Sequence, residues 1–109
     1  MFLKIEGKAA MGKTTAAFLM AAGAHSVAIC DCEGGLDNRI EHSSLPVPVI
    51  RVEPSLKAIL DHISDEASDV LIIDGFDVLA KNNTRDRIEA AVLEHPCMLV
   101  VTVGQDKGR

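Results

Sequence analysis

Residues 7–14 have the sequence Gly7-Lys8-Ala9-Ala10-Met11-Gly12-Lys13-Thr14, which matches the pattern G-x-x-x-x-G-K-[ST] at every fixed position. The flanking residues predict a short strand over 2–6 and a helix over 15–20. A strand, a loop and a helix in this order form the setting in which the pattern binds phosphate. The stretch therefore predicts an α/β fold whose first strand leads into a phosphate-binding loop.

The residue types of this loop suit a triphosphate. Gly7 and Gly12 allow the backbone to curl so that its N–H groups converge on an anion, and the helix N-terminus adds partial positive charge. Lys13 is predicted to reach the β- and γ-phosphates, and Thr14 to hold Mg²⁺. The predicted nucleotide-binding residues are Gly7, Lys8, Ala9, Ala10, Met11, Gly12, Lys13, Thr14 and Thr15. An ordinary glycine-rich turn is the alternative, but the register and the flanks favour a nucleoside triphosphate site.

Composition limits the class of protein. The 109 residues are enough for one domain, and with three Phe and no Trp or Tyr the core must consist of Ala, Val, Ile and Leu. No apolar run approaches the roughly 20 residues that cross a bilayer, and no signal peptide precedes the loop. With three Cys, reduced thiols and a cytoplasmic location are expected. Cys30 and Cys32 are expected on one face of a strand, as core residues rather than zinc ligands.

Strands and helices alternate along the chain. Further strands are predicted over residues 26–31, 47–52, 70–74 and 97–103. Pro54 is predicted to open one helix, and residues 82–84 to cap another. This alternation indicates a parallel sheet with right-handed crossovers.

Two acidic residues follow strands of this predicted sheet. Asp74 ends the most apolar run, at the edge where ligands bind in open α/β sheets, and is predicted to hold Mg²⁺ beside Thr14 rather than to cap a turn. Asp77 is a second candidate, but the turn at Gly75 is expected to direct it elsewhere. Glu33 emerges at the same edge, where a carboxylate either is merely solvated or orients the water that attacks the γ-phosphate.

Several segments resemble the RecA-type ATPase core in the right order. The doubled threonine of Gly12–Thr15 matches the family's loop, and Ile29–Gly35 is similar to its D-x-E-G segment. Val70–Asp74 resembles its Walker B strand, and Val100–Gln105 resembles the strand that ends in Gln. The small phage-type RecA-like ATP-binding proteins are the nearest in kind.

The resemblance implies a site and a function. Lys13, Glu33 and Gln105 would be catalytic, with Glu33 as the carboxylate that activates water and Gln105 as the γ-phosphate sensor. ATP and Mg²⁺ would be the cofactors, and ATP hydrolysis would serve DNA recombination, replication or repair. Lys107 and Arg109 would reach a neighbour's phosphate in trans, unless they are simply solvated chain ends.

The resemblance also implies the architecture. It predicts a three-layer P-loop NTPase fold with a five-stranded, mainly parallel sheet in the order 3-2-4-5-1, flanked by helices. Residues 1–109 would form one minimal RecA-like nucleotide-binding domain, or one truncated at its C-terminus. The strand before the loop would then lie at an edge, which a partner ATPase or a second copy would cover.

Two other functions stay open. Lys8 matches the signature lysine of the ParA/MinD class, whose members dimerise around ATP in partitioning or positioning. A nucleotide-dependent interaction module without hydrolysis is the third reading. The net charge of −5 and the lack of a basic stripe mean that any contact with single-stranded DNA is local, made by an oligomer or supplied by a partner.

Overall fold

The apolar runs of the sequence form the strands of one sheet in the computed structural model, which describes residues 1–7, 12–79 and 83–105. The strands are β1 (Phe2–Gly7), β2 (Val27–Asp31), β3 (Ile50–Arg51), β4 (Val70–Asp74) and β5 (Leu99–Gln105). Their order is β1-β5-β4-β2-β3, and the four pairings among the described residues are parallel. This order is 3-2-4-5-1 counted from the other edge, so the predicted strand order is confirmed.

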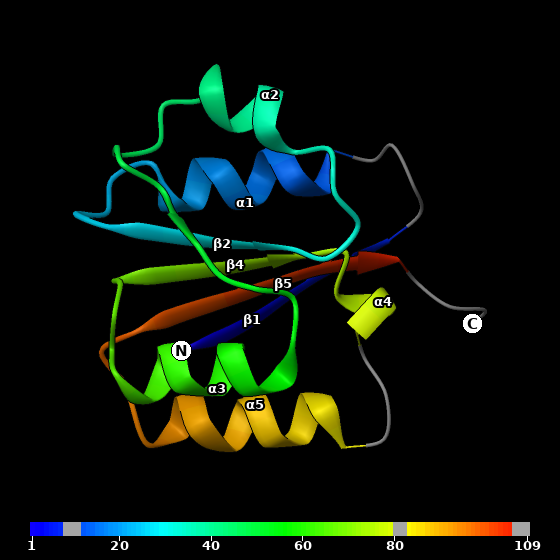
Figure 1. The fold of residues 1–109 in the computed structure, drawn as a ribbon, viewed down its shortest axis with the longest axis vertical. Helices are drawn as coiled ribbons and strands as arrows, with labels where there is room; N and C mark the ends of the chain where they lie inside the picture. The colour runs from blue at the N-terminus through cyan, green and yellow to red at the C-terminus, as the bar shows by residue number, and fades with distance from the viewer. Residues whose placement is uncertain (8–11, 80–82, 106–109) are drawn as a thin grey trace.

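Helices cover both faces of the sheet (Figure 1). They are α1 (Lys13–Ala21), α2 (Asp37–Glu41), α3 (Leu56–Ser64), α4 (Phe76–Leu79) and α5 (Thr84–Leu93). α1 and α2 lie on one face, whereas α3 and α5 lie on the other. Among the described helices, none has both the length and the apolar character that crossing a membrane requires.

The central strand β4 shows why its sequence is a continuous apolar run. Val70 and Ile72 pack with α1, while Leu71 and Ile73 pack with α3 and α5. A strand with helices on both faces has no solvated side, so every position favours an apolar side chain. The run therefore marks the middle of the sheet.

Several predicted boundaries were wrong, including that of the first helix, which was predicted over 15–20 and begins at Lys13. The strand predicted over 47–52 is reduced to Ile50–Arg51, because it pairs only with β2 and Pro48 has no N–H to donate. The helix predicted to open at Pro54 begins at Leu56, where Ser55 is the N-cap and its Oγ accepts from the Ala58 N–H at 3.2 Å. The last strand is shifted to Leu99–Gln105 because its pairing with β1 extends to Gly7. The short helices α2 and α4 were not predicted.

The strand that precedes the glycine-rich loop lies at an edge of the sheet, as predicted. Lys4 and Glu6 are exposed, and Ile5 packs toward α1. Arg85 at the start of α5 donates to Glu6 Oε2 at 3.0 Å, and its guanidinium lies 4.9 Å from the centroid of the Phe76 ring. Arg85 thus joins α5 to the edge strand.

Candidate functional site

The candidate site lies where the strands of the sheet end. The carboxyl ends of β1, β4 and β5 lie at the same side of the molecule as the first turn of α1 (Figure 1). Gly12 precedes α1 with a φ of 75°, in the left-handed region that favours glycine. The chain therefore enters α1 with the N-terminus of the helix directed toward this edge.

Two predicted metal ligands, 60 residues apart in sequence, meet at this edge. The Thr14 hydroxyl donates a hydrogen bond to Asp74 Oδ1 at 2.7 Å. Thr14 comes from the first turn of α1, and Asp74 is the last residue of β4. Hydroxyl and carboxylate oxygens are ligands that suit Mg²⁺, which usually keeps water and phosphate oxygens for its other positions. The donor set therefore fits the predicted ion, although the described residues contain no cluster of three or more His, Cys, Asp or Glu arranged for a metal.

The side-chain carboxylate of Asp74 lies in an environment that disfavours its negative charge. Only 8% of the residue is exposed, and this burial raises its pKa above the usual value. The hydrogen bond from Thr14 acts in the opposite direction, as do the charges of Arg39 and Lys13, while the nearby Asp31 adds to the increase. A cation at this position would relieve the cost of the buried charge, which is the behaviour expected of a metal ligand.

Lys13 contacts the end of β1. Its Nζ donates to the carbonyl oxygen of Gly7, the last residue of β1, at 2.9 Å. The ammonium group thus lies between the two ends of the segment that the sequence predicts to bind phosphate. An anion bound in the loop would compete with the Gly7 carbonyl for this charge.

Glu33 lies beside the end of β4, as the shared sheet edge predicted. The turn that carries it is held by Asp31, whose two carboxylate oxygens accept from the N–H groups of Gly34 at 2.9 Å and Leu36 at 3.1 Å. The Glu33 side chain packs over Gly75 so closely that a Cβ on Gly75 would lie 2.7 Å from Glu33 Cγ and 2.9 Å from Oε1. Glu33 is exposed to solvent, so its carboxylate can meet a water molecule beside Gly75, the residue that follows Asp74.

The structure describes the other predicted site residues only in part. Gln105 ends β5 with its backbone opposite Gly7, which brings its position to the start of the loop. Lys8, Ala9, Ala10 and Met11 lie outside the described residues, as do Lys107 and Arg109. Asp77 lies against β5, where a Cβ on Gly104 would be 3.3 Å from its Oδ1. Gly104 is the residue before Gln105, so this contact places Asp77 at the carboxyl end of β5. That the turn at Gly75 directs Asp77 away from the metal stays a prediction.

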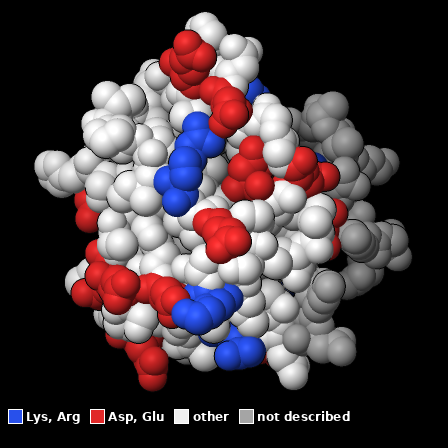
Figure 2. Space-filling model, in the orientation of Figure 1, with Lys and Arg blue, Asp and Glu red and all other residues white. Residues whose placement is uncertain are grey.

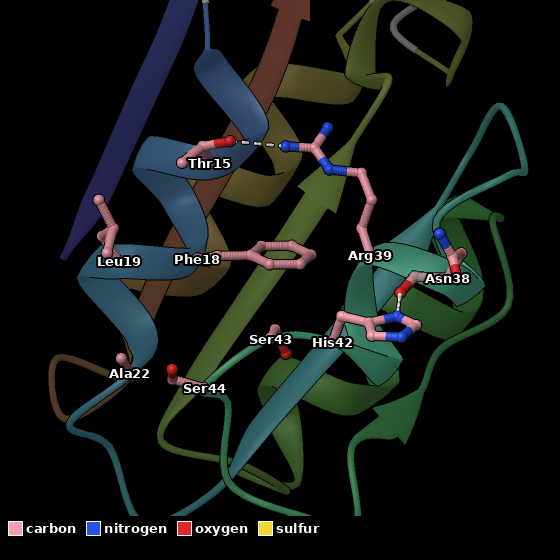
Figure 3. A pocket seen from close by; sticks show the side chains of 9 residues that line it. All are labelled: Thr15, Phe18, Leu19, Ala22, Asn38, Arg39, His42, Ser43 and Ser44. Atoms are coloured by element: carbon pink, nitrogen blue, oxygen red, sulfur yellow. Dashed lines mark hydrogen bonds between the residues drawn. The ribbon is translucent and has the colours of Figure 1, made fainter.

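One cation near the site, Arg39, was not predicted from the sequence. Arg39 of α2 donates from Nη2 to Thr15 Oγ1 at 2.7 Å, and its guanidinium lies 5.9 Å from the centroid of the Phe18 ring (Figure 3). α2 is only five residues long and follows a glycine-containing turn. Its direction depends on how Leu36 and Ile40 pack into the core, and no local pattern reveals that.

Cys30 and Cys32 face the same way, as predicted, with their Sγ atoms 3.8 Å apart. The backbone N–H of Cys32 donates to the carbonyl oxygen of Asp74 at 2.9 Å. This bond ties the end of β2 to the end of β4 and so helps to hold Glu33 near Asp74.

The face of the molecule seen in Figure 2 is mixed in charge. Lys and Arg side chains are interspersed with Asp and Glu over the face in Figure 2, without a continuous basic area. No protein-family model matches the chain, and no curated protein matches its sequence.

Proposed function

We propose that this chain binds and hydrolyses a nucleoside triphosphate with Mg²⁺, as a minimal RecA-like P-loop ATPase. The hydrogen bond between Thr14 and Asp74 is the observation that supports the proposal most strongly. It joins the last residue of the glycine-rich pattern to the carboxylate that is predicted to hold the metal. The two motifs were identified independently in the sequence, and neither one alone predicts this contact.

Each residue near this pair has a role in the proposed reaction. Lys13 binds the β- and γ-phosphates, and Thr14 and Asp74 hold Mg²⁺. The ion supplies positive charge that offsets the negative charge gathering on the phosphate oxygens. Glu33 accepts a proton from the attacking water, or orients it, because its carboxylate is exposed beside Gly75. Gln105 senses the γ-phosphate from the end of β5.

The choice of ATP and the link to DNA recombination, replication or repair rest on the RecA resemblance alone. Single-stranded DNA and a second ATPase subunit are the partners that it proposes. The formal net charge of −5 makes a broad electrostatic contact with DNA unfavourable. A DNA contact would therefore be local or would need an assembly.

Hydrolysis assays test the proposal. We expect Mg²⁺-dependent release of phosphate from ATP, stimulated by single-stranded DNA. Glu33→Gln should lower turnover by roughly 10²–10⁴-fold and leave ATP binding intact, because it removes only the proton acceptor. Glu94→Gln is the matched control, since Glu94 is exposed at the far end of α5. A Glu33→Gln variant with wild-type turnover would refute the catalytic role.

Lys8 supports a second function, ATP-dependent dimerisation of the ParA/MinD type, because it matches the signature lysine of that class. In that case Lys8→Ala abolishes ATP-dependent dimerisation, and Glu33→Gln has no effect. Tight ATP binding without turnover, with or without DNA, would instead identify a nucleotide-dependent interaction module.

A further inference from the structure

Two cysteines lie at the carboxyl end of β2, immediately before Glu33. The Sγ atoms of Cys30 and Cys32 are 3.8 Å apart. β2 and β4 are neighbours in the sheet, so this pair lies next to the end of the strand that carries Asp74 (Figure 1). The described residues contain no group of three or more His, Cys, Asp or Glu that could hold a metal ion. The chemistry that this pair offers is therefore that of two adjacent thiols.

The two thiols differ in their access to solvent. Cys30 is fully buried in the core that α3 and α5 cover, and its Sγ also lies 3.7 Å from the carbonyl oxygen of Glu53. Cys32 is only partly buried. Because the reactivity of a thiol depends on its exposure, a reagent in solution meets Cys32 first. Cys30 is then close enough to attack the product that forms on Cys32.

Formation of a bond between the two sulfur atoms would move Cys32 rather than Cys30. A disulfide holds its sulfur atoms about 2.05 Å apart, and its Cα atoms usually lie about 5.5–6 Å apart. Residues two apart in an extended chain have Cα atoms roughly 6.6 Å apart, so the bond shortens this stretch. Cys30 is inside β2, where it pairs with Ile73 of β4, whereas Cys32 lies beyond the last residue of β2. The displacement therefore falls on Cys32.

Cys32 holds the start of the turn that carries Glu33. Its backbone N–H donates to the carbonyl oxygen of Asp74 at 2.9 Å. Glu33 follows Cys32 directly and packs over Gly75. A displacement of Cys32 breaks its bond to Asp74 and moves the Glu33 carboxylate. The oxidation state of the two thiols is thereby linked to the position of the predicted catalytic carboxylate.

We propose that Cys30 and Cys32 form a thiol-modification site, which a low-molecular-weight disulfide oxidises to an intramolecular disulfide that displaces Glu33. Cys32 Sγ, having given its proton to solvent, attacks one sulfur of the reagent and expels the other half as a thiolate. Cys30 Sγ, likewise deprotonated, then attacks Cys32 Sγ and expels the second thiolate. The two expelled thiolates take up the two protons, so the cysteines lose two electrons and the reagent gains them.

Oxidised glutathione tests the proposal in a Cys97→Ser background, because Cys97 is exposed and would react by itself. Mass spectrometry should show the loss of two hydrogens from the protein and no attached glutathione. Adding Cys30→Ala should leave one glutathione on Cys32, since no second thiol is present to expel it. Adding Cys32→Ser instead should prevent the reaction, since the remaining Cys30 is buried. Glutathione that stays attached while Cys30 is present, or no reaction of the Cys97→Ser protein, would overturn the site.

Amide hydrogen exchange at Cys32 measures the displacement. We expect exchange to become about tenfold faster or more on oxidation, because the bond to Asp74 is lost, and to return to its original rate after dithiothreitol. Unchanged exchange in the oxidised protein would overturn the displacement of Glu33.

The effect on turnover rests on the proposed function, whereas the disulfide and the amide exchange do not. Phosphate release should fall by roughly tenfold on oxidation, as for a misplaced catalytic group, and should recover with dithiothreitol. Equal turnover of the two forms would overturn the link to Glu33. If the reduced protein hydrolyses no triphosphate, the proposed function fails, and the mass and exchange measurements still decide this inference.

Discussion

Polar side chains at the amino ends of the strands differ from those at the carboxyl ends in their hydrogen bonding and burial. At the amino ends of the strands, Ser68 and His62 form hydrogen bonds with the backbone and with each other. Ser68 donates to the carbonyl oxygen of Val70 at 2.9 Å, so the 2.7 Å contact with His62 is a bond that the histidine Nε2 donates. At the carboxyl ends, Asp74 is buried with a raised pKa, and Glu33 is pressed against Gly75.

This contrast separates stability from function. The amino end satisfies its hydrogen bonds and leaves little capacity for a ligand. The carboxyl end holds the buried Asp74 carboxylate, whose ionised form is disfavoured by burial. It also holds the Thr14 hydroxyl that donates to this carboxylate, and Lys13, whose charge acts to lower the Asp74 pKa. Unfavourable charge of this kind is typical of sites that gain their missing interactions from a ligand. Substitutions at the two ends should therefore have different consequences.

Among the substitutions that compare the two ends of the sheet, Asp74→Asn should give the largest effect. We expect Mg²⁺-dependent turnover to fall by on the order of 10²–10³-fold, because the amide is a poor metal ligand. In EDTA at pH 7 the same variant should unfold at a higher temperature than the wild type. Burial raises the pKa of Asp74, so the ionised carboxylate costs stability above that pKa, and Asn removes this cost while still accepting from Thr14.

Asp69→Asn serves as the control for this variant, since Asp69 is exposed at the amino end, immediately before β4. It should change neither turnover nor the melting temperature. A lower melting temperature for Asp74→Asn in EDTA would contradict the conclusion that the buried charge of Asp74 destabilises the fold.

Gly75→Ala should give the next largest effect. Gly75 has a φ of 74°, and an added Cβ would collide with the Glu33 side chain. Gly34→Ala is the matched control, because its φ of 84° is similar but its Cβ would meet nothing within 4 Å. Each change should cost roughly 1–2 kcal/mol of unfolding free energy from the backbone alone. Only Gly75→Ala should displace Glu33 and lower turnover, by tenfold or so on the scale of a misplaced catalytic group.

Denaturant unfolding and phosphate release measure the two quantities for each variant. Equal turnover in Gly75→Ala and Gly34→Ala would show that the position of Glu33 beside Gly75 is irrelevant to catalysis.

His62 should give the smallest effect, confined to stability. Burial lowers its pKa below the usual 6.5, so the folded protein favours the neutral ring that donates to Ser68. The stability that this ring provides is present above pH 6.5 and is lost as the pH falls toward the lower pKa of the folded state. Urea titrations from pH 7.5 to 5 should show this decline in the wild type, and His62→Gln should reduce it.

His25→Gln is the comparison variant, because His25 is exposed. It should retain the wild-type slope of stability against pH. Turnover at pH 7.5 should be the same in both histidine variants, and a loss in His62→Gln would mean that the two ends of the sheet are coupled.

Much of this site could be predicted because local patterns carried it. The glycine-rich stretch sets where the first strand ends and the first helix begins, and the apolar run ending in Asp74 marks the central strand. Parallel strands bring their carboxyl ends to one edge, so Thr14, Glu33 and Asp74 could be expected together. The strand order came from the RecA resemblance, and the observed sheet agrees with it.

By itself, therefore, the sequence determined the α/β class, the approximate positions of the strands and the chemical types gathered at one edge. Only the tertiary structure decided the contacts among them: the bond from Thr14 to Asp74, the packing of Glu33 on Gly75, and the reach of Arg39 to Thr15. The physical reason is the separation along the chain over which each effect acts. Periodicity and turn chemistry act over a few neighbouring residues, whereas these contacts join distant segments whose directions are set by how helices pack on the sheet.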